Sequence, residues 1–318
     1  MELQFLGTSS GTPTKTRNVS ALAIRATGSR QWSLVDCGEG TQHRILQTRL
    51  SLRSLHAIFI THTHGDHCYG LPGLLASAGM LNRTDELFIV APVAIARFVQ
   101  CVLDTTQPWL PYPLRFLDVE EAPRILFADF AVQATALSHR VPSFAYSFTE
   151  RAVENRLDAA RLERDGIPPG PVWGQIQQGA DAELADGRRV RARDYLLPTR
   201  KPRKVIVGGD NDRPALLSAE ARTADVLIHE ATYTEAVLNR VGADVQHSSA
   251  LRVAEFARDA GIVNLVLTHF SPRYQDEKGA LTLADLEAEA RAVYPGRLFL
   301  ANDLERYVLD RQGVLAKA

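Results

Sequence analysis

Residues 61–67 read Thr-His-Thr-His-Gly-Asp-His, which places three histidines and one aspartate within six positions. The run follows an apolar stretch, residues 57–61, that predicts a strand, and it precedes a helical pattern at residues 70–81. Imidazole and carboxylate groups are typical ligands of Zn²⁺ in proteins. A solvated histidine-rich loop is the alternative, but crowding titratable groups into one turn has no structural gain. The motif therefore favours a metal site.

The same arrangement, an apolar strand followed by a polar residue, recurs later in the chain. Three such strands, with the residues that end or follow them, are 204–207 with Asp210, 225–229 with Glu230, and 265–268 with His269. Their continuous apolar character indicates strands buried on both faces, with helices outside the sheets. We therefore expect an α/β fold whose site lies at the strand ends.

The remaining hydrophobic periodicities complete this α/β pattern. Further strands are predicted at 2–6, 21–26, 32–36, 87–91 and 130–137, and further helices at 93–103, 248–259 and 283–292.

Composition excludes several classes of protein. The chain has 318 residues, 45% of them hydrophobic, which is typical of a globular protein and not of a disordered one. No apolar stretch approaches the roughly 20 residues of a membrane span, and no secretory signal precedes the first strand. Three widely spaced cysteines fit reduced thiols. These features predict a cytoplasmic protein that makes no membrane contact.

Residues 151–203 interrupt the α/β pattern. Residues 151–204 contain 12 Lys and Arg against 8 Asp and Glu, whereas the whole chain has a net charge of -1. The segment has a Gly-Pro centre at 166–171. Its apolar residues are sparse, so we expect it to have no hydrophobic core of its own. We expect one domain over 1–318 with an inserted arm at 151–203, since long insertions in compact domains are usually functional.

Arginines near the end of this arm could bind phosphates. Arg188, Arg189, Arg191 and Arg193 follow a strand pattern that would place them on one face. Clustered arginines offer phosphate contacts whose strength falls with salt, although a solvated charged hairpin would look similar.

The motif His-x-His-x-Asp-His resembles the signature of the metallo-β-lactamase superfamily. That resemblance implies an αβ/βα sandwich, two packed mixed sheets with helices outside, and a site for two Zn²⁺ ions. It also implies the ligands: His62, His64 and His139 for one ion, Asp66, His67 and His269 for the other, and Asp210 between both. By itself, Asp210 would fit a turn residue equally well.

Within the superfamily, the chain is most similar to the ribonuclease Z family. Residues 13–18, Pro-Thr-Lys-Thr-Arg-Asn, resemble the family's loop for the tRNA 3′ end, although in isolation they fit an ordinary turn. Other similar segments lie at 36–42, 229–232, 247–249 and 271–274. The resemblance covers nearly the whole chain, but Asn211 stands where the family more often has threonine, and Gln246 where it has glycine.

This resemblance implies a zinc-dependent endoribonuclease that removes 3′ trailers from precursor tRNA and forms a homodimer whose arm grips the tRNA. Asp66 would accept a proton from the attacking water, and Glu230 and His247 would relay one to the leaving oxygen. The alternative is that Glu230 is a structural ion-pair partner and that His247 is a residue at a helix N-terminus. The implied substrate contacts are Lys15, Arg17, Asn18, Arg188, Arg189 and Arg273. We also expect Asp36 to orient a ligand histidine, because ligating imidazoles usually donate their second N–H to a carboxylate or carbonyl; a plain turn aspartate is the alternative.

Two rival functions remain. A hydrolase or phosphodiesterase of the same fold that acts on a small-molecule ester would use the same metal site, but the arm and the loop at 13–18 argue against it. A catalytically silent RNA-binding or scaffold protein is the second rival. Such a protein has no chemical need for seven intact ligands.

Overall fold

The structure, a computed structural model, describes residues 1–275 and 279–318. Its first sheet has eight strands in the order β19-β18-β1-β2-β3-β4-β5-β6, parallel from β3 to β6 and antiparallel elsewhere. The strands are β1 (Glu2–Gly7), β2 (Ala21–Arg25), β3 (Trp32–Val35), β4 (Leu55–Phe59), β5 (Leu87–Ala91), β6 (Leu114–Asp118), β18 (Arg306–Leu309) and β19 (Leu315–Lys317).

The second sheet has seven strands in the order β17-β16-β15-β14-β9-β8-β7. The four strands from β14 to β17 are parallel, and β9 pairs with β14 in the antiparallel direction. The strands are β7 (Arg124–Leu126), β8 (Phe130–Leu137), β9 (Ser143–Glu150), β14 (Lys204–Val207), β15 (Val226–Glu230), β16 (Asn264–Thr268) and β17 (Arg297–Leu300).

Alternation along the strands explains how continuous apolar runs bury both faces. In β14, Val205 and Val207 belong to the core between the sheets, whereas Ile206 faces the outer helices. In β4, Phe59 faces the other sheet and Ile58 packs on the helices outside the first sheet. The helices are α1 (Thr41–Ile45), α2 (Gly65–Cys68), α3 (Leu71–Met80), α4 (Val93–Thr106), α7 (Ser218–Ala221), α8 (Glu235–Val241), α9 (Ala250–Asp259) and α10 (Leu283–Arg291).

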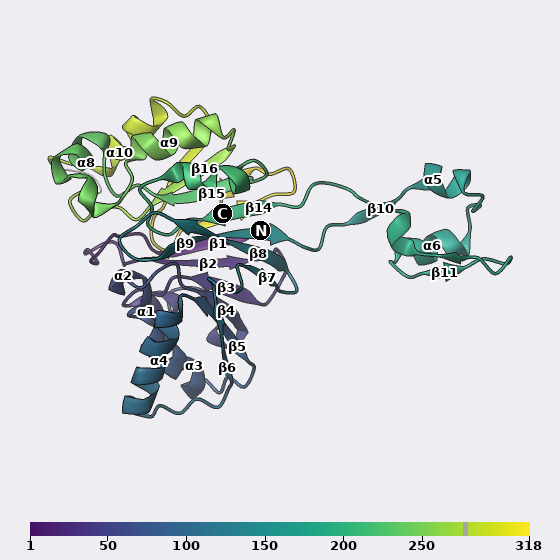
Figure 1. The fold of residues 1–318 in the computed structure, drawn as a ribbon, viewed down its shortest axis with the longest axis horizontal. Helices are drawn as coiled ribbons and strands as arrows, with labels where there is room; N and C mark the ends of the chain where they lie inside the picture. The colour runs from purple at the N-terminus through teal and green to yellow at the C-terminus, as the bar shows by residue number, and fades with distance from the viewer. Residues whose placement is uncertain (276–278) are drawn as a thin grey trace. The chain divides into compact units, whose positions relative to one another are not determined.

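Aromatic side chains hold the two sheets face to face. The ring of Phe59, from the first sheet, lies 5.0 Å from the rings of both Tyr146 and Phe148 in β9. The Tyr146 hydroxyl donates to the carbonyl oxygen of Ile60 at 2.8 Å, which links the sheets beside the metal motif. Helices α8 to α10 lie outside the second sheet, and α1 to α4 lie outside the first (Figure 1).

The predicted α/β architecture, two mixed sheets between outer helices, is confirmed. The sequence did not indicate several strands, among them β6, β9, β17, β18 and β19. In β9, Ser143-Phe-Ala-Tyr-Ser-Phe-Thr-Glu150 mixes hydroxyl and apolar residues without clean alternation, yet the strand lies between β8 and β14 and is almost wholly buried. Burial by neighbouring strands overrides a weak local pattern there.

The chain divides into two compact units, and Glu150–Pro202 forms the second of them. Its elements are β10 (Asn155–Leu157), α5 (Ala159–Arg164), α6 (Pro171–Gln177), β11 (Ala182–Glu183), β12 (Arg189–Val190) and β13 (Leu196–Pro198). The expectation that this segment has no core of its own is wrong. Leu162, Ile176 and Val190 are buried together in a small hydrophobic cluster.

The expected strand of alternating arginines is also wrong. β12 ends at Val190, and Ala192–Asp194 forms a 3-10 turn, because Asp194 pairs with Arg191 at 2.9 Å and the chain bends there.

No helix among residues 1–275 and 279–318 is both long enough and apolar enough to span a membrane.

Candidate metal centre

The site residues lie just beyond the ends of strands from both sheets. His62 and His64 follow β4, and the short helix α2 carries Asp66 and His67. From the second sheet, His139 follows β8, Asp210 follows β14, and His269 follows β16. The same ends of neighbouring strands meet at one edge of the sandwich, so residues more than 200 positions apart come within contact.

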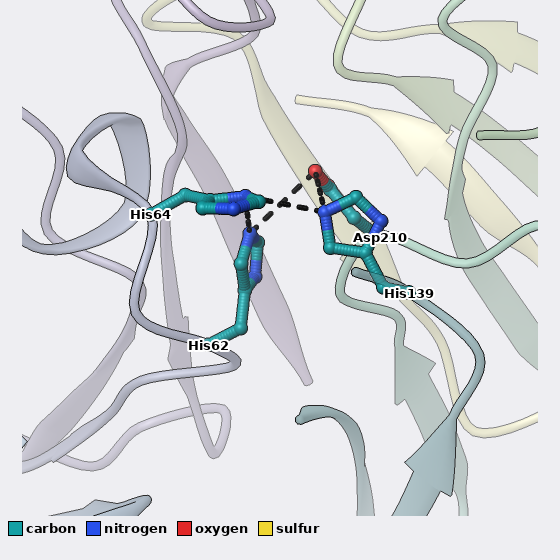
Figure 2. Close-up of side chains that lie close together, drawn as sticks. All are labelled: His62, His64, His139 and Asp210. Carbon is teal, nitrogen blue, oxygen red and sulfur yellow. Dashed lines mark hydrogen bonds and ion pairs between the residues drawn. The ribbon is translucent and has the colours of Figure 1, made fainter. Parts of the chain in front are cut away.

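One cluster consists of His62, His64, His139 and Asp210, whose ligand atoms point toward one another (Figure 2). His64 Nδ1 lies 3.1 Å from His62 Nε2 and 3.2 Å from His139 Nε2. Asp210 Oδ2 lies 3.6 Å from both His62 Nε2 and His139 Nε2.

A second cluster consists of Asp66, His67 and His269. His269 Nε2 lies 3.2 Å from His67 Nε2 and 3.3 Å from Asp66 Oδ2. The other oxygen of Asp210, Oδ1, lies 3.5 Å from His67 Nε2 and 3.4 Å from His269 Nε2. Asp210 therefore offers one carboxylate oxygen to each cluster.

These spacings fit metal coordination better than hydrogen bonding. Four ligands held tetrahedrally about 2.0–2.1 Å from a Zn²⁺ ion stand about 3.3 Å from one another. The distances between ligand atoms in both clusters, 3.1 to 3.6 Å, lie around that value. Their nitrogen and oxygen donors are also of the types that Zn²⁺ accepts. Each cluster therefore has the donor types and the spacing to hold a metal ion, and Asp210 offers an oxygen to each.

The second ring nitrogen of each of three ligands is held by the protein. Asp36 Oδ2 lies 2.7 Å from Nδ1 of His67, as expected for an orienting carboxylate. The carbonyl oxygen of Gln246 lies 2.8 Å from Nδ1 of His139. The hydroxyl of Thr232 lies 3.0 Å from Nδ1 of His269. Such partners fix the tautomer and direction of a ligand ring.

Buried carboxylates make the second cluster favour positive charge, whereas burial is the main cause that lowers the pKa values of His62, His64 and His139 in the first. Burial opposes protonation of His67, but Asp36, Asp66 and Asp210 outweigh it and raise its pKa well above the ordinary value. Burial would raise the pKa of Asp66, but the charge of His67 and a hydrogen bond from His269 hold that pKa far below its usual range. A cation bound between these groups would be stabilised in the same way.

Glu230 and His247 form a pair beside the two clusters. His247 Nδ1 lies 3.1 Å from Glu230 Oε1, and the His247 ring is 5.1 Å from that of His139. Burial lowers the pKa of His247, but the charge and hydrogen bond of Glu230 outweigh it and raise that pKa to about 9. Glu230 is held in place by the Thr232 hydroxyl, at 2.5 Å from its Oε2.

The structure brings together all the predicted metal ligands and the Glu230–His247 pair, but it places the predicted substrate contacts differently. Lys15 is exposed, and the side chain of Asn18 donates to the carbonyl of Glu39 at 2.9 Å. Arg273 is exposed, with its guanidinium 5.8 Å from the Tyr233 ring, which lies 6.1 Å from the His247 ring. Arg188 and Arg189 are exposed on the second unit.

Arg17 does not fit the substrate contact that the sequence predicted. Its side chain is only 6% exposed and donates to the Thr8 hydroxyl and the Ala301 carbonyl oxygen, both at 2.8 Å. The guanidinium also lies 5.3 Å from the centre of the Phe270 ring. Arg17 therefore holds the loop at 8–18 against the sheet. That loop reaches the metal clusters through the backbone N–H of Gly11, which donates to Asp66 Oδ2 at 2.7 Å.

Sequence reasoning missed two hydroxyl residues at the site. Thr61 donates its hydroxyl to Asp36 and lies 3.0 Å from His62 Nδ1, and Thr232 joins Glu230 to His269. Both follow apolar strands, the signal that marked the ligands themselves. A threonine at a strand end is too common for that signal to identify it.

Three of the residues with left-handed backbone torsions other than glycine lie at this site. They are Asp36 with φ 58°, Gln246 with φ 51° and His269 with φ 59°. Side chains other than glycine adopt this conformation at a cost. Gln246 contributes only its backbone carbonyl to His139, and its side-chain Oε1 is buried without a hydrogen bond.

We expect Gln246→Gly to stabilise the protein. Glycine removes the strain of the left-handed conformation and the unpaired Oε1, and it keeps the carbonyl that holds His139. After the entropic cost of an added glycine, a gain of about 0.5–1 kcal/mol remains. Urea unfolding of the metal-free wild type and variant measures it. A lower unfolding free energy for the variant would contradict this account of Gln246.

The comparisons with known proteins agree over the whole chain. Ribonuclease Z of Pseudomonas putida (strain GB-1) is 54% identical over 316 residues, which is 99% of each protein. The human short-form tRNase Z structure matches with a TM-score of 0.67 and 25% identity, over 98% of this chain and 100% of that one.

Two further matches support less: one shows only the fold, and the other covers only part of the chain. Bacillus subtilis YhfI, a metallo-β-lactamase fold protein, matches with a TM-score of 0.64 at 17% identity, over 100% of this chain and 99% of that one, which shows the fold alone. A family model described as anti-Pycsar protein Apyc1 matches residues 1–100. The expected metallo-β-lactamase fold is confirmed, and the full-length identity shows that this chain belongs to the ribonuclease Z family.

Proposed function

We propose that the chain is an endoribonuclease that cuts 3′ trailers from precursor tRNA and leaves a 3′-hydroxyl. The observation that carries this proposal is the meeting of seven ligand residues and the Glu230–His247 pair at one sheet edge, in a chain 54% identical to a ribonuclease Z over its length. The name of the human structural neighbour, tRNase Z, specifies tRNA as the substrate class.

The two clusters would hold two Zn²⁺ ions. His62, His64 and His139 would bind one, Asp66, His67 and His269 the other, and Asp210 both. Bound metals of this kind polarise a phosphoryl oxygen and lower the pKa of water to near neutrality.

Asp66 is suited to accept the proton of the attacking water. Its Oδ2 is fixed between His269 Nε2 at 3.3 Å and the backbone N–H of Gly11 at 2.7 Å, so the carboxylate has a defined direction. The charges around it keep it ionised. A positioned base of this kind speeds proton transfer.

His247 is suited to protonate the leaving 3′-oxygen. Its Nδ1 is held by Glu230 at 3.1 Å, so Nε2 is the ring nitrogen available to the substrate. Glu230 in turn accepts hydrogen bonds from Thr232 and from the backbone N–H of Ser248. The carboxylate thus fixes the ring and favours its protonated form.

The RNA would be held by residues around this site and by the second unit. Lys15, Asn18 and Arg273 lie on segments joined to the site, and their positive or amide groups suit phosphate and base contacts. Arg188 and Arg189 would add phosphate contacts from the arm. A small-molecule ester hydrolase is less consistent with these features, because such a substrate needs no arm.

A cleavage assay tests the function. Purified protein is incubated with precursor tRNA whose trailer follows the discriminator base, with and without an encoded CCA, and the product ends are mapped. We expect a 3′-hydroxyl product from the wild type, and activity that is lost with a chelator and restored by Zn²⁺. Metal analysis is expected to give two ions per chain.

The matched variant is Asp66→Ala, which is expected to keep the fold, measured by circular dichroism, and to lose cleavage. Intact precursor tRNA after incubation with zinc-loaded wild type would contradict the proposal. Full activity with a single tightly bound ion would contradict the two-metal mechanism.

Deleting the arm should separate RNA binding from chemistry. Thr149 and Lys204 are paired in the adjacent antiparallel strands β9 and β14, so a short Gly/Ser turn can replace residues 151–203. All seven proposed ligands lie in the other unit. We expect hydrolysis of a chromogenic phosphodiester to persist, while tRNA affinity and its salt dependence fall.

The arm's charge is tested separately by Arg189→Gln with Arg193→Gln, because both side chains are highly exposed, at 87% and 75%. This double variant keeps the arm's core and should lower the salt dependence of binding by about two phosphate contacts at most. Wild-type cleavage of precursor tRNA by the deletion variant would show that the arm is not a binding element.

We further propose that the protein is a cytoplasmic homodimer in which the arm of one subunit grips tRNA cut by the other. Tyr69, 64% exposed after α2, and Val93, 47% exposed at the start of α4, are apolar surface groups that a second subunit could cover. Light scattering of the purified protein is expected to give the mass of two chains, and a mass of one chain would exclude the dimer.

A further inference from the structure

Asn211 is a fully buried polar residue directly after the shared ligand Asp210. Its side-chain Oδ1 accepts hydrogen bonds from the backbone N–H of Ser138 at 3.3 Å and of Arg213 at 3.1 Å. Its Nδ2 lies 3.1 Å from Nε2 of His229. Because Ser138 immediately precedes His139, the amide ties the loop of one proposed ligand to the loop of another.

His229 completes this arrangement as a neutral acceptor. The two backbone donors identify Oδ1 of Asn211, so the end of the amide that faces His229 is the NH₂ donor. Nδ1 of His229 lies 2.8 Å from the carbonyl oxygen of Glu230, which can only accept, so Nδ1 carries the proton. Nε2 of His229 therefore accepts a hydrogen bond from Nδ2 of Asn211. Both ring nitrogens of His229 and both polar atoms of the Asn211 amide then have a hydrogen-bond partner.

The backbone of Asn211 reaches the Glu230–His247 pair. Its N–H donates to Glu230 Oε1 at 3.2 Å, the same oxygen that lies 3.1 Å from His247 Nδ1. Its carbonyl oxygen accepts from the Ser248 hydroxyl at 2.6 Å. A shift of Asn211 would therefore displace Asp210 on one side and Glu230 on the other.

We propose that Asn211, held by His229, is a positioning residue that fixes the shared metal ligand Asp210 relative to the Glu230–His247 pair. Neither Asn211 nor His229 touches the metal or the substrate in this role. The part that concerns the leaving oxygen rests on the proposed ribonuclease function, whereas the part that concerns metal binding does not.

A purely structural role for Asn211 is the alternative, and the chain offers a matched control. Asn264 is also fully buried and also makes three side-chain hydrogen bonds, to the carbonyl oxygens of Asp225 at 2.7 Å and Gly313 at 2.9 Å and from the N–H of Leu315 at 3.1 Å. It begins β16, whereas His269 follows the other end of that strand. Asn264→Ala therefore removes the same kind of bonds far from the site.

The test compares Asn211→Ala with Asn264→Ala in the full-length protein. Unfolding in urea is measured after metal removal, Zn²⁺ affinity by competition with a chromogenic chelator, and coordination geometry by the visible spectrum of the Co²⁺ form. Single-turnover cleavage of precursor tRNA and tRNA affinity are measured at saturating metal. We expect both variants to be less stable.

Only Asn211→Ala should bind Zn²⁺ about 10–100-fold more weakly, alter the Co²⁺ spectrum and cleave about 10–100-fold more slowly, with tRNA affinity unchanged. Wild-type metal affinity, spectrum and rate in Asn211→Ala would overturn the proposal. Weakened metal binding together with a wild-type protein that does not cleave precursor tRNA would support the positioning of Asp210 and count against the proposed function.

A second pair of variants serves if Asn211→Ala does not fold. His229→Leu removes the acceptor for Asn211, whereas His229→Gln offers a carbonyl oxygen in its place. We expect the leucine variant to lose metal affinity as above and the glutamine variant to recover most of it. Equal metal affinity and equal Co²⁺ spectra in the two variants would overturn the proposal.

Discussion

The divided carboxylate of Asp210 is the constraint on which the rest of the site depends. One oxygen faces His62 and His139 and the other faces His67 and His269, so strands of both sheets must end within a few ångströms of a single side chain. The backbone at Gly209, directly before Asp210, also lies close to both sheets. A Cβ on Gly209 would stand 2.7 Å from Cβ of Thr61 and 2.8 Å from the carbonyl oxygen of Phe144, so only glycine fits.

Sequence predicted the part of the site that follows from a simple rule, that polar residues directly after buried strands meet at one sheet edge. The resemblance to the metallo-β-lactamase superfamily was needed to assign His139 as a ligand, whereas Asp210, Glu230 and His269 could be singled out by this rule. Arg17 could not, since nothing local distinguishes an arginine that points to solvent from one that binds internal carbonyls. The network through Asn211 and His229 also lay beyond sequence, because each of its bonds joins loops distant in the chain.

Strands that are apolar on both faces could be predicted from the sequence. Strands that are buried only because other strands flank them could not. β14 and β15 show continuous valine, isoleucine and leucine, whereas β9 has serine and threonine and is buried only because β8 and β14 flank it. The core of the second unit has the same origin. Leu162, Ile176 and Val190 are widely spaced and form no periodic pattern, yet they meet when its short helices pack.

The attachment of the second unit between two paired strands has a consequence for how such enzymes can change. Thr149 and Lys204 are directly opposite each other in the paired strands β9 and β14, so the segment between them enters and leaves the sheet at nearly one point. The register of β9 with β14 therefore does not depend on the length or sequence of that segment. Under the proposed role of this unit in RNA binding, natural variation or protein design could lengthen, shorten or exchange it without altering the residues of the candidate metal centre. Substrate range and catalytic activity could then evolve independently.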